Sequence, residues 1–206
     1  WAQKMGGIGK EQSNSVFADA SGNVFISGFF SETVDFDPGA GITNKVSNGL
    51  QDVFICKFTT NGSFVWVVTF GGTGTDIAKS LALDGAGNIC VIGVFTGSVD
   101  FDPGTTTVNI TAVGSQEVFI CKFTTNGGFV WAVPFLAQSD QLEVSGTAIA
   151  VDQAGLEFLA GVEVQFVRGL TQEERDRVAG GVHFRGGAFL LRHVVELREH
   201  VARDFA

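Results

Sequence analysis

VFICKFTTNG, at residues 53–62, occurs a second time without a single change at residues 118–127. The same distance separates the three tryptophans, since Trp1, Trp66 and Trp131 follow one another at intervals of 65 residues (66 − 1 and 131 − 66). A fixed period of this length is typical of architectures in which one supersecondary unit stacks on the next, because a single unit cannot bury both of its faces. The repeat therefore predicts shape before any single residue predicts chemistry.

Each copy of the repeat contains four short stretches that are typical of β-strands, because they are rich in β-branched and aromatic residues and are bounded by turn-forming residues. The third and fourth stretches are joined by Asn61-Gly62 in one copy and by Asn126-Gly127 in the other. This dipeptide favours a type I′ hairpin. The expected strands are 15–19, 23–30, 53–60 and 64–70 in the first copy, and 77–84, 88–95, 118–125 and 129–135 in the second.

Four antiparallel strands in a period of 65 residues fit one blade of a β-propeller. A parallel β-helix has much shorter coils, and an immunoglobulin-like domain needs about 100 residues. We therefore expect an all-β, partial propeller over residues 1–161, with the end of one blade, two nearly complete blades and the start of another. Because closed propellers have roughly four to eight blades, this arc is expected to be a fragment, or to close with another copy.

Several separate motifs of the repeat carry a family resemblance. A pair of glycines precedes S-x-A-x-D-x-x-G-N-I-x-V-x-G in the second copy, VDFDPG stands at 34–39 and 99–104, and D/E-VFICKF-TTNG-x-FVW completes each copy. In this form residues 1–161 resemble the SBBP β-propeller repeat of bacteria. The resemblance implies a large secreted or cell-surface bacterial protein, although no signal peptide opens this chain, and a repeat that serves binding or structural scaffolding without enzymatic activity.

The charge of the chain bears on its partners. The net charge is −9, and residues 1–155 alone hold six Lys, no Arg and 14 acidic residues. An acidic surface repels nucleic-acid phosphates and anionic membranes, and no run of 18 apolar residues indicates a membrane span. The expected partners are neighbouring blades of a longer chain or another copy, together with a protein or carbohydrate ligand.

The strongest candidate for a chemical site is the pair of DFDPG segments, which contain Asp35 and Asp37 in one copy and Asp100 and Asp102 in the other. Two carboxylates at i and i+2 followed by Gly resemble the start of a calcium loop, but Ca²⁺ takes six to eight oxygen ligands. Backbone carbonyls, Glu32 or water would have to supply the others. The alternative is an Asp-Pro-Gly turn, in which Asp accepts backbone amides and Pro presets φ. Both interpretations stay open at this point.

Two further groups recur in the repeat and are expected to be structural. Asp19-x-x-Gly22-Asn23 has its copy at 84–88, and Asp and Asn in such a turn bond nearby backbone groups. Cysteines stand at one shared position of both copies and at the position where the first copy has Phe25. Since a free Cys usually behaves as a small hydrophobe, we expect buried structural thiols at Cys56, Cys90 and Cys121.

An enzyme is the alternative to a binding module. A fragment of an extracellular lyase or hydrolase that acts on polysaccharides would carry its site in the propeller channel. Such a site would need His, Tyr, Arg or carboxylates that break the repeat in one blade. The chain has no Tyr, and residues 1–161 have neither His nor Arg. We therefore expect no enzymatic activity.

Residues 162–206 do not belong to the repeat, and their pattern is helical. A capping-box sequence stands at 171–174. Apolar residues then recur at helical spacing, at Leu190, Val194, Leu197, Val201 and Phe205. The basic residues change here from Lys only to Arg only, as a frameshift or a join between unrelated sequences would cause. A helical cap or linker and a separate functional module are the other interpretations.

Overall fold

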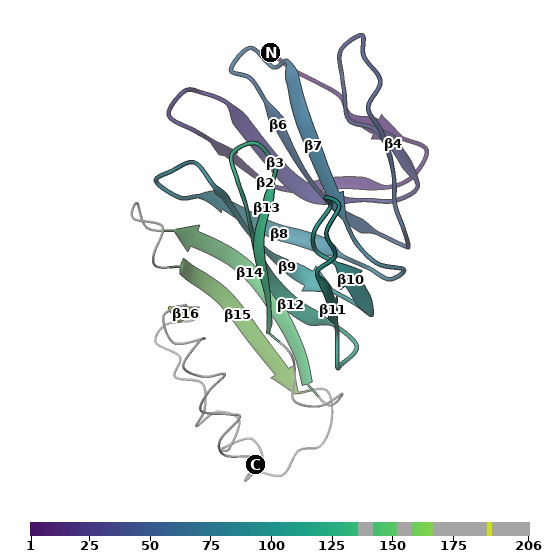
Figure 1. The fold of residues 1–206 in the computed structure, drawn as a ribbon, viewed down its shortest axis with the longest axis vertical. Coiled ribbons are helices and arrows are strands. Elements are labelled where there is room, and N and C mark those ends of the chain that lie inside the picture. Colours follow the sequence, from purple (N-terminus) through teal and green to yellow (C-terminus); the bar gives the residue numbers. More distant parts are fainter. Residues whose placement is uncertain (136–141, 152–157, 167–188, 191–206) are drawn as a thin grey trace.

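The structure is a computed structural model, and it describes residues 1–135, 142–151, 158–166 and 189–190 (Figure 1). Every regular element in these residues is a β-strand, which confirms the predicted all-β class. Two four-stranded antiparallel sheets form the body of the molecule, and a third sheet lies beside them. No helix in this part of the chain is long and apolar enough to cross a membrane.

Each four-stranded sheet holds one copy of the repeat, and we call the two sheets the first and second blade. Neighbouring strands are antiparallel, and the order is β2-β3-β6-β7 in the first blade and β8-β9-β12-β13 in the second. Their bounds agree with the predicted strands, except that the first strand begins earlier than expected. The first blade contains β2 (Glu11–Ala18), β3 (Val24–Phe30), β6 (Asp52–Phe58) and β7 (Phe64–Phe70). The second contains β8 (Ile77–Leu83), β9 (Ile89–Phe95), β12 (Glu117–Phe123) and β13 (Phe129–Phe135).

The early start of β2 comes from backbone pairing that the apolar pattern does not show. Glu11 pairs with Phe30 of β3, and a bulge separates Ser13 from Ser15. Five of the eight residues of β2 are exposed, so its first residues do not have to be apolar. The polar residues at 11–13 therefore join the strand through backbone pairing with β3.

A small hairpin interrupts each blade between its second and third strands, where the sequence predicted only a long connection. β4 (Thr33–Asp35) pairs with β5 (Asn44–Val46), and β10 (Ser98–Asp100) pairs with β11 (Asn109–Thr111). In the first blade, β1 (Gly6–Gly7) adds to this hairpin by pairing with β4. The DFDPG segments thus begin inside a strand and form the bend of the hairpin.

The tight turns differ from the predicted type I′ form. The Gly62 N–H donates to the Thr59 carbonyl at 2.9 Å, and the Thr59 N–H donates to the Ser63 carbonyl at 2.9 Å. Gly62 has a φ of +79°, whereas Asn61 is not in the left-handed region that a type I′ turn requires. The I′ prediction is therefore wrong. The pairing shifts after Lys57, which gives room for a longer turn with a single left-handed residue.

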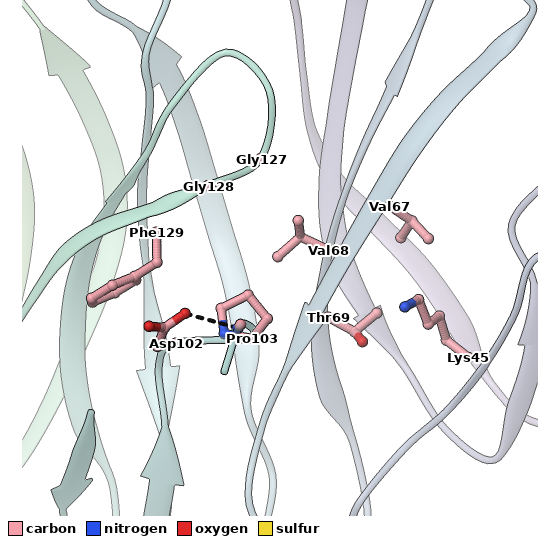
Figure 2. Close-up of a pocket in the computed structure, with 10 residues that line it drawn as sticks. Lys45, Val67, Val68, Thr69, Asp102, Pro103, Gly127, Gly128 and Phe129 are labelled. Atoms are coloured by element: carbon pink, nitrogen blue, oxygen red, sulfur yellow. Dashed lines mark hydrogen bonds between the residues drawn. The ribbon is translucent and has the colours of Figure 1, made fainter. Parts of the chain in front are cut away.

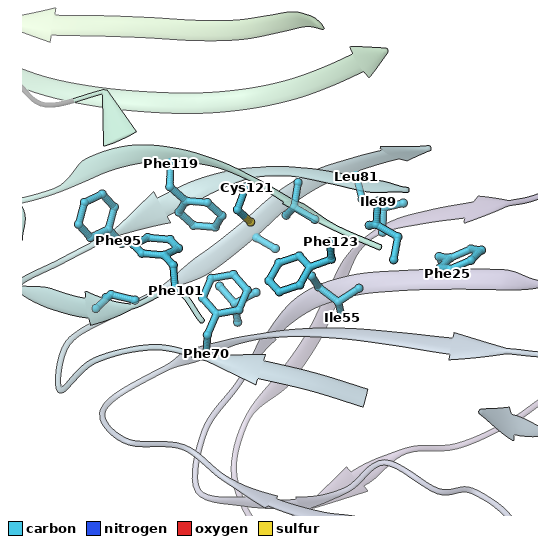
Figure 3. Packing of buried hydrophobic residues seen from close by; sticks show 14 residues of the cluster. Phe25, Ile55, Phe70, Leu81, Ile89, Phe95, Phe101, Phe119, Cys121 and Phe123 are labelled. Carbon is cyan, nitrogen blue, oxygen red and sulfur yellow. The ribbon is translucent and has the colours of Figure 1, made fainter. Parts of the chain in front are cut away.

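The main hydrophobic core lies between the two blades (Figure 3). Phe70, from the last strand of the first blade, stacks on Phe123 of the second with ring centroids 5.7 Å apart. It also meets the edge of Phe119 at 5.7 Å. Complete burial of each such ring contributes roughly 1.5–3 kcal/mol. The other labelled members are Phe25, Ile55, Leu81, Ile89, Phe95, Phe101 and Cys121.

A third sheet follows the second blade, in the region where the start of another blade is predicted. β14 (Leu142–Val151) pairs with β15 (Phe158–Phe166), which continues past residue 161, and β15 pairs with β16 (Phe189–Leu190). Leu190, where the predicted helical spacing begins, lies in this strand, because it pairs with Leu159. The rest of the predicted helical tail, including 171–174, lies outside the described residues.

Two glycines of the second blade lie where a side chain would be unfavourable, for two different reasons. A Cβ at Gly93 would stand 2.2 Å from the Ile77 carbonyl oxygen and 2.5 Å from the Phe119 ring. At Gly87 the nearest atom would be 3.8 Å away, but φ is +79°. Gly87→Ala should therefore cost about 1–2 kcal/mol from strain alone, and Gly93→Ala about 3 kcal/mol or more.

Urea denaturation of both variants measures these costs. Gly87→Asn is the matched control, since Asn tolerates the left-handed region better than Ala. Equal losses for Gly87→Ala and Gly93→Ala would contradict the close strand approach at Gly93.

Candidate functional site

The first Asp of each DFDPG segment closes the hairpin loop that follows it. Asp35 Oδ1 accepts the N–H groups of Asp37 at 3.0 Å and of Thr43 at 2.8 Å. Asp100 Oδ1 has the same arrangement, with distances of 3.1 Å and 2.8 Å to the amides of the residues two and eight positions later. These carboxylates therefore connect the two arms of each hairpin.

The second Asp of each segment caps the turn itself. Asp37 Oδ1 accepts the Gly39 N–H at 2.8 Å, and Asp102 Oδ1 accepts the Gly104 N–H at 2.8 Å. Asp102 Oδ2 also accepts the Thr106 hydroxyl. In the described part of the chain, no three His, Cys, Asp or Glu side chains gather closely enough to hold a metal. These contacts favour the turn interpretation, and calcium binding at the loops stays a prediction.

The Phe between the two aspartates anchors each loop to its blade. Phe36 is buried and meets Phe54 at 5.1 Å between ring centroids, while Phe101 is buried and meets Phe119 at 5.2 Å. Successive residues of an extended segment point to opposite sides. The D-F-D alternation therefore buries the ring and leaves both carboxylates at the turn.

A groove of about 250 Å³ lies between the blades, next to the second DFDPG loop (Figure 2). Strand β7 forms one wall, and the turn before β13 forms the other with the loop at Asp102. β7 is the edge strand of its sheet, so one side of its backbone is not used by that sheet. The groove offers one cation, one carboxylate, a hydroxyl and apolar surface, from Lys45, Asp102, Thr69, Val68, Pro103 and Phe129.

This groove could not be found from the motifs. Lys45 belongs to the first copy of the repeat and Asp102 to the second, and stacking of the blades places both on its lining. The sequence places them 57 residues apart (102 − 45). The one signal available was the repeat itself, because a groove between two equivalent blades is expected to recur at every junction.

Lys57 and Lys122 occupy the same position of the repeat but make different contacts. Lys122 Nζ forms a 2.7 Å ion pair with Asp84. Burial alone would raise the pKa of Asp84, but Lys122 and the hydrogen bonds from Asn88 and Ala86 lower it to about 2. Lys57 instead lies over the Phe25 ring, 5.0 Å from its centroid.

The two lysines have different residues beside them at one equivalent position. Phe25 stands where the second copy has Cys90, and only an aromatic ring offers the cation a π face. From there Lys57 donates across the junction to the carbonyl and hydroxyl oxygens of Thr125, each at 3.4 Å. Lys57 therefore joins the first blade to the second.

The recurring Asp turns and the cysteines are structural, as predicted. Asp19 Oδ1 accepts the N–H groups of Ser21 and Asn23, both at 2.9 Å. Cys56, Cys90 and Cys121 are buried and form no disulfide. Burial raises the pKa of the Cys90 thiol to about 12 and also raises the pKa of the other two. Thiols held in this protonated form are poor nucleophiles and metal ligands.

Comparison with known proteins supports the fold more than the function. No family model matches the chain. The chain is 30% identical over 112 residues to an uncharacterized WD repeat-containing protein, L264, of Acanthamoeba polyphaga mimivirus. The match covers 48% of this chain but only 8% of that protein. WD repeats form β-propeller blades, so the match and the sheets together support a propeller-type repeat.

A calcium titration tests the predicted loop site. The calcium hypothesis predicts that millimolar Ca²⁺ raises the melting temperature relative to EDTA, and that Asp37→Ala combined with Asp102→Ala removes this shift. Asp19→Ala is the matched control, because Asp19 caps a different turn and should keep the shift. An unchanged melting temperature in the native chain would contradict calcium binding at these carboxylates.

Proposed function

We propose that this chain is a non-enzymatic β-propeller repeat module for binding or scaffolding, and that its open face docks a further blade of the same kind. The stacking of the two described blades and the similarity to a WD repeat-containing protein support the proposal. The motif resemblance to the SBBP repeat extends it to a secreted or cell-surface protein.

The observation that carries the proposal is a difference between two equivalent residues. Val16 of β2 and Leu81 of β8 occupy the same repeat position (81 − 16 = 65). Leu81 is 3% exposed and lies in the core between the blades, whereas Val16 is 67% exposed. Leu81 faces the first blade, and its N–H donates to Ser15 Oγ of that blade at 3.1 Å. Val16 has no such blade beside it among the described residues.

The N-terminal residues show how a preceding blade fits this face. Trp1 and Met5 are the repeat counterparts of Trp66 and Phe70, which belong to the last strand of a blade. The Trp1 ring lies 6.5 Å from that of Phe58, and its Nε1 donates to the Thr60 carbonyl at 2.9 Å. Met5 Sδ is 3.9 Å from the Cys56 sulfur. These residues thus contact the first blade through side chains that correspond to those of an outer strand.

The uncovered part of the face defines the chemistry of its partner. On the second blade, the equivalent surface around Leu81 belongs to one buried cluster with Phe25, Val53 and Ile55 of the first blade. The partner is therefore a β-sheet that presents apolar side chains in the same pattern. Another blade of this repeat meets that description, from a longer chain or from a second copy.

The groove beside β7 is the proposed place for a ligand. Its mixture of charge, hydroxyl and apolar surface suits an extended polar chain, either a peptide or a carbohydrate. Because it forms at a blade junction, ligand binding and blade stacking depend on each other.

Sedimentation of the intact chain tests the docking face. The native chain should associate with a second copy as its concentration rises, and Val16→Asp should weaken this association roughly tenfold or more, since a charge would be buried in place of an apolar side chain. Val65→Asp is the matched control, because Val65 is exposed but lies on the outer strand β7. A native chain that stays monomeric at high concentration, or an equal effect of both variants, would contradict docking of a second copy.

A further inference from the structure

Two buried carboxyl groups meet at the junction between the blades. Asp52 opens β6 of the first blade, Asp76 stands directly before β8 of the second, and each is 1% exposed. A Cβ on Gly71 would lie 2.7 Å from Asp52 Oδ1 and 2.9 Å from Asp76 Oδ2. The two oxygens thus face the same point, and the absence of a side chain at Gly71 gives them room.

Three of the four carboxyl oxygens accept backbone amides. Asp52 Oδ2 accepts the Asn48 N–H at 2.9 Å. Asp76 accepts the Gly72 N–H at 2.8 Å and the Thr96 N–H at 3.1 Å. The remaining oxygen, Asp52 Oδ1, is buried and accepts no hydrogen bond from the described residues. These contacts tie the linker between the blades to both of them.

Among the described residues, no opposite charge acts on the pair. The groups that face it from the packed segments are backbone amides, at Asn48, Gly49, Gly72 and Thr96, and the side-chain charge that acts on Asp76 is that of Asp52. The ion pair between Lys122 and Asp84 lies elsewhere. Two neighbouring carboxylates that are buried cannot both stay ionised without a large free-energy cost.

We propose that the Asp52–Asp76 pair holds one proton between the blades, so that mild acid strengthens the junction and a rise in pH weakens it. A proton on Asp52 Oδ1 converts the unpartnered oxygen into a donor that faces Asp76. A metal ion fits less well, because Ca²⁺ takes six to eight oxygens and three of these four already accept amide hydrogens.

The direction of the pH effect follows from burial. Burial raises the pKa of Asp52, and burial together with the Asp52 charge raises the pKa of Asp76 from 3.8 to about 6. Between pH 3.8 and about pH 6, the folded chain therefore binds more protons than the unfolded chain. The free energy of unfolding consequently increases as the pH falls through this range. Asp19 and Asp84 act oppositely, because their pKa values are lowered and their contribution is lost only in stronger acid.

Each member of the pair has an acidic counterpart in another copy of the repeat. Glu11 is the counterpart of Asp76 (76 − 11 = 65), and its Oε1 accepts the Gly7 N–H at 2.8 Å, as Asp76 accepts that of Gly72. Glu117 is the counterpart of Asp52 and is fully buried. The acid of the third strand therefore recurs at position 117 and the acid that follows the glycine pair recurs at position 11, whereas the complete pair is described at Asp52 and Asp76.

A pH titration of the intact native chain tests the proposal directly. Carboxyl ¹³C NMR should show one of the two aspartates titrating at about pH 6. The melting temperature should rise by about 3 °C or more between about pH 7.5 and pH 5. Asp52→Asn imitates the protonated form, so it should raise the melting temperature at the higher pH and flatten the profile.

Asp19→Asn is the matched control, because the pKa of Asp19 is lowered by its hydrogen bonds with Asn23, and this variant should leave the slope in this pH range unchanged. If Asp52→Asn fails to fold, the NMR titration of the native chain still decides. Two aspartates that both titrate below about pH 4.5 would overturn the proposal. So would a calcium-dependent rise in melting temperature that Asp52→Asn abolishes, since the pair would then bind a metal ion.

Discussion

Apolar packing between adjacent β-sheets is the constraint on which the rest of this structure depends. The largest core cluster draws Phe25, Ile55 and Phe70 from the first blade and Leu81 and Phe123 from the second. Neither sheet could bury these side chains alone, so each blade folds as part of a stack. The hydrogen bonds that cross the junction, such as those from Lys57 to Thr125, supplement this packing.

Polar features of the chain are arranged around that constraint. The DFDPG loops each insert one Phe into the core and use their carboxylates to shape the loop that remains outside. The groove beside β7 and the acid pair at Asp52 and Asp76 both form where two copies of the repeat meet. Candidate binding and proton-responsive features therefore belong to junctions and not to single blades.

The repeat predicted the eight blade strands well, because their alternation and apolar content reflect local backbone preference and burial. It did not predict that β2 begins at Glu11, since that segment is held by backbone pairing and carries no apolar pattern. The turn at Gly62 was predicted as type I′ because Asn-Gly favours it, but the pairing shift after Lys57 selects a different turn. The groove and the acid pair were missed, because both depend on contacts between residues far apart in the chain.

Native-state hydrogen exchange can compare β2 with β8 and so test whether blade packing protects a strand, because these strands are equivalent in the repeat but differ in what covers them. We expect strong protection of the β8 amides at Ile77–Leu83 and weaker protection at Glu11–Ala18 in dilute solution. Protection of β2 should then rise with protein concentration as a second copy docks. Equal protection of both strands at every concentration would contradict an open blade face.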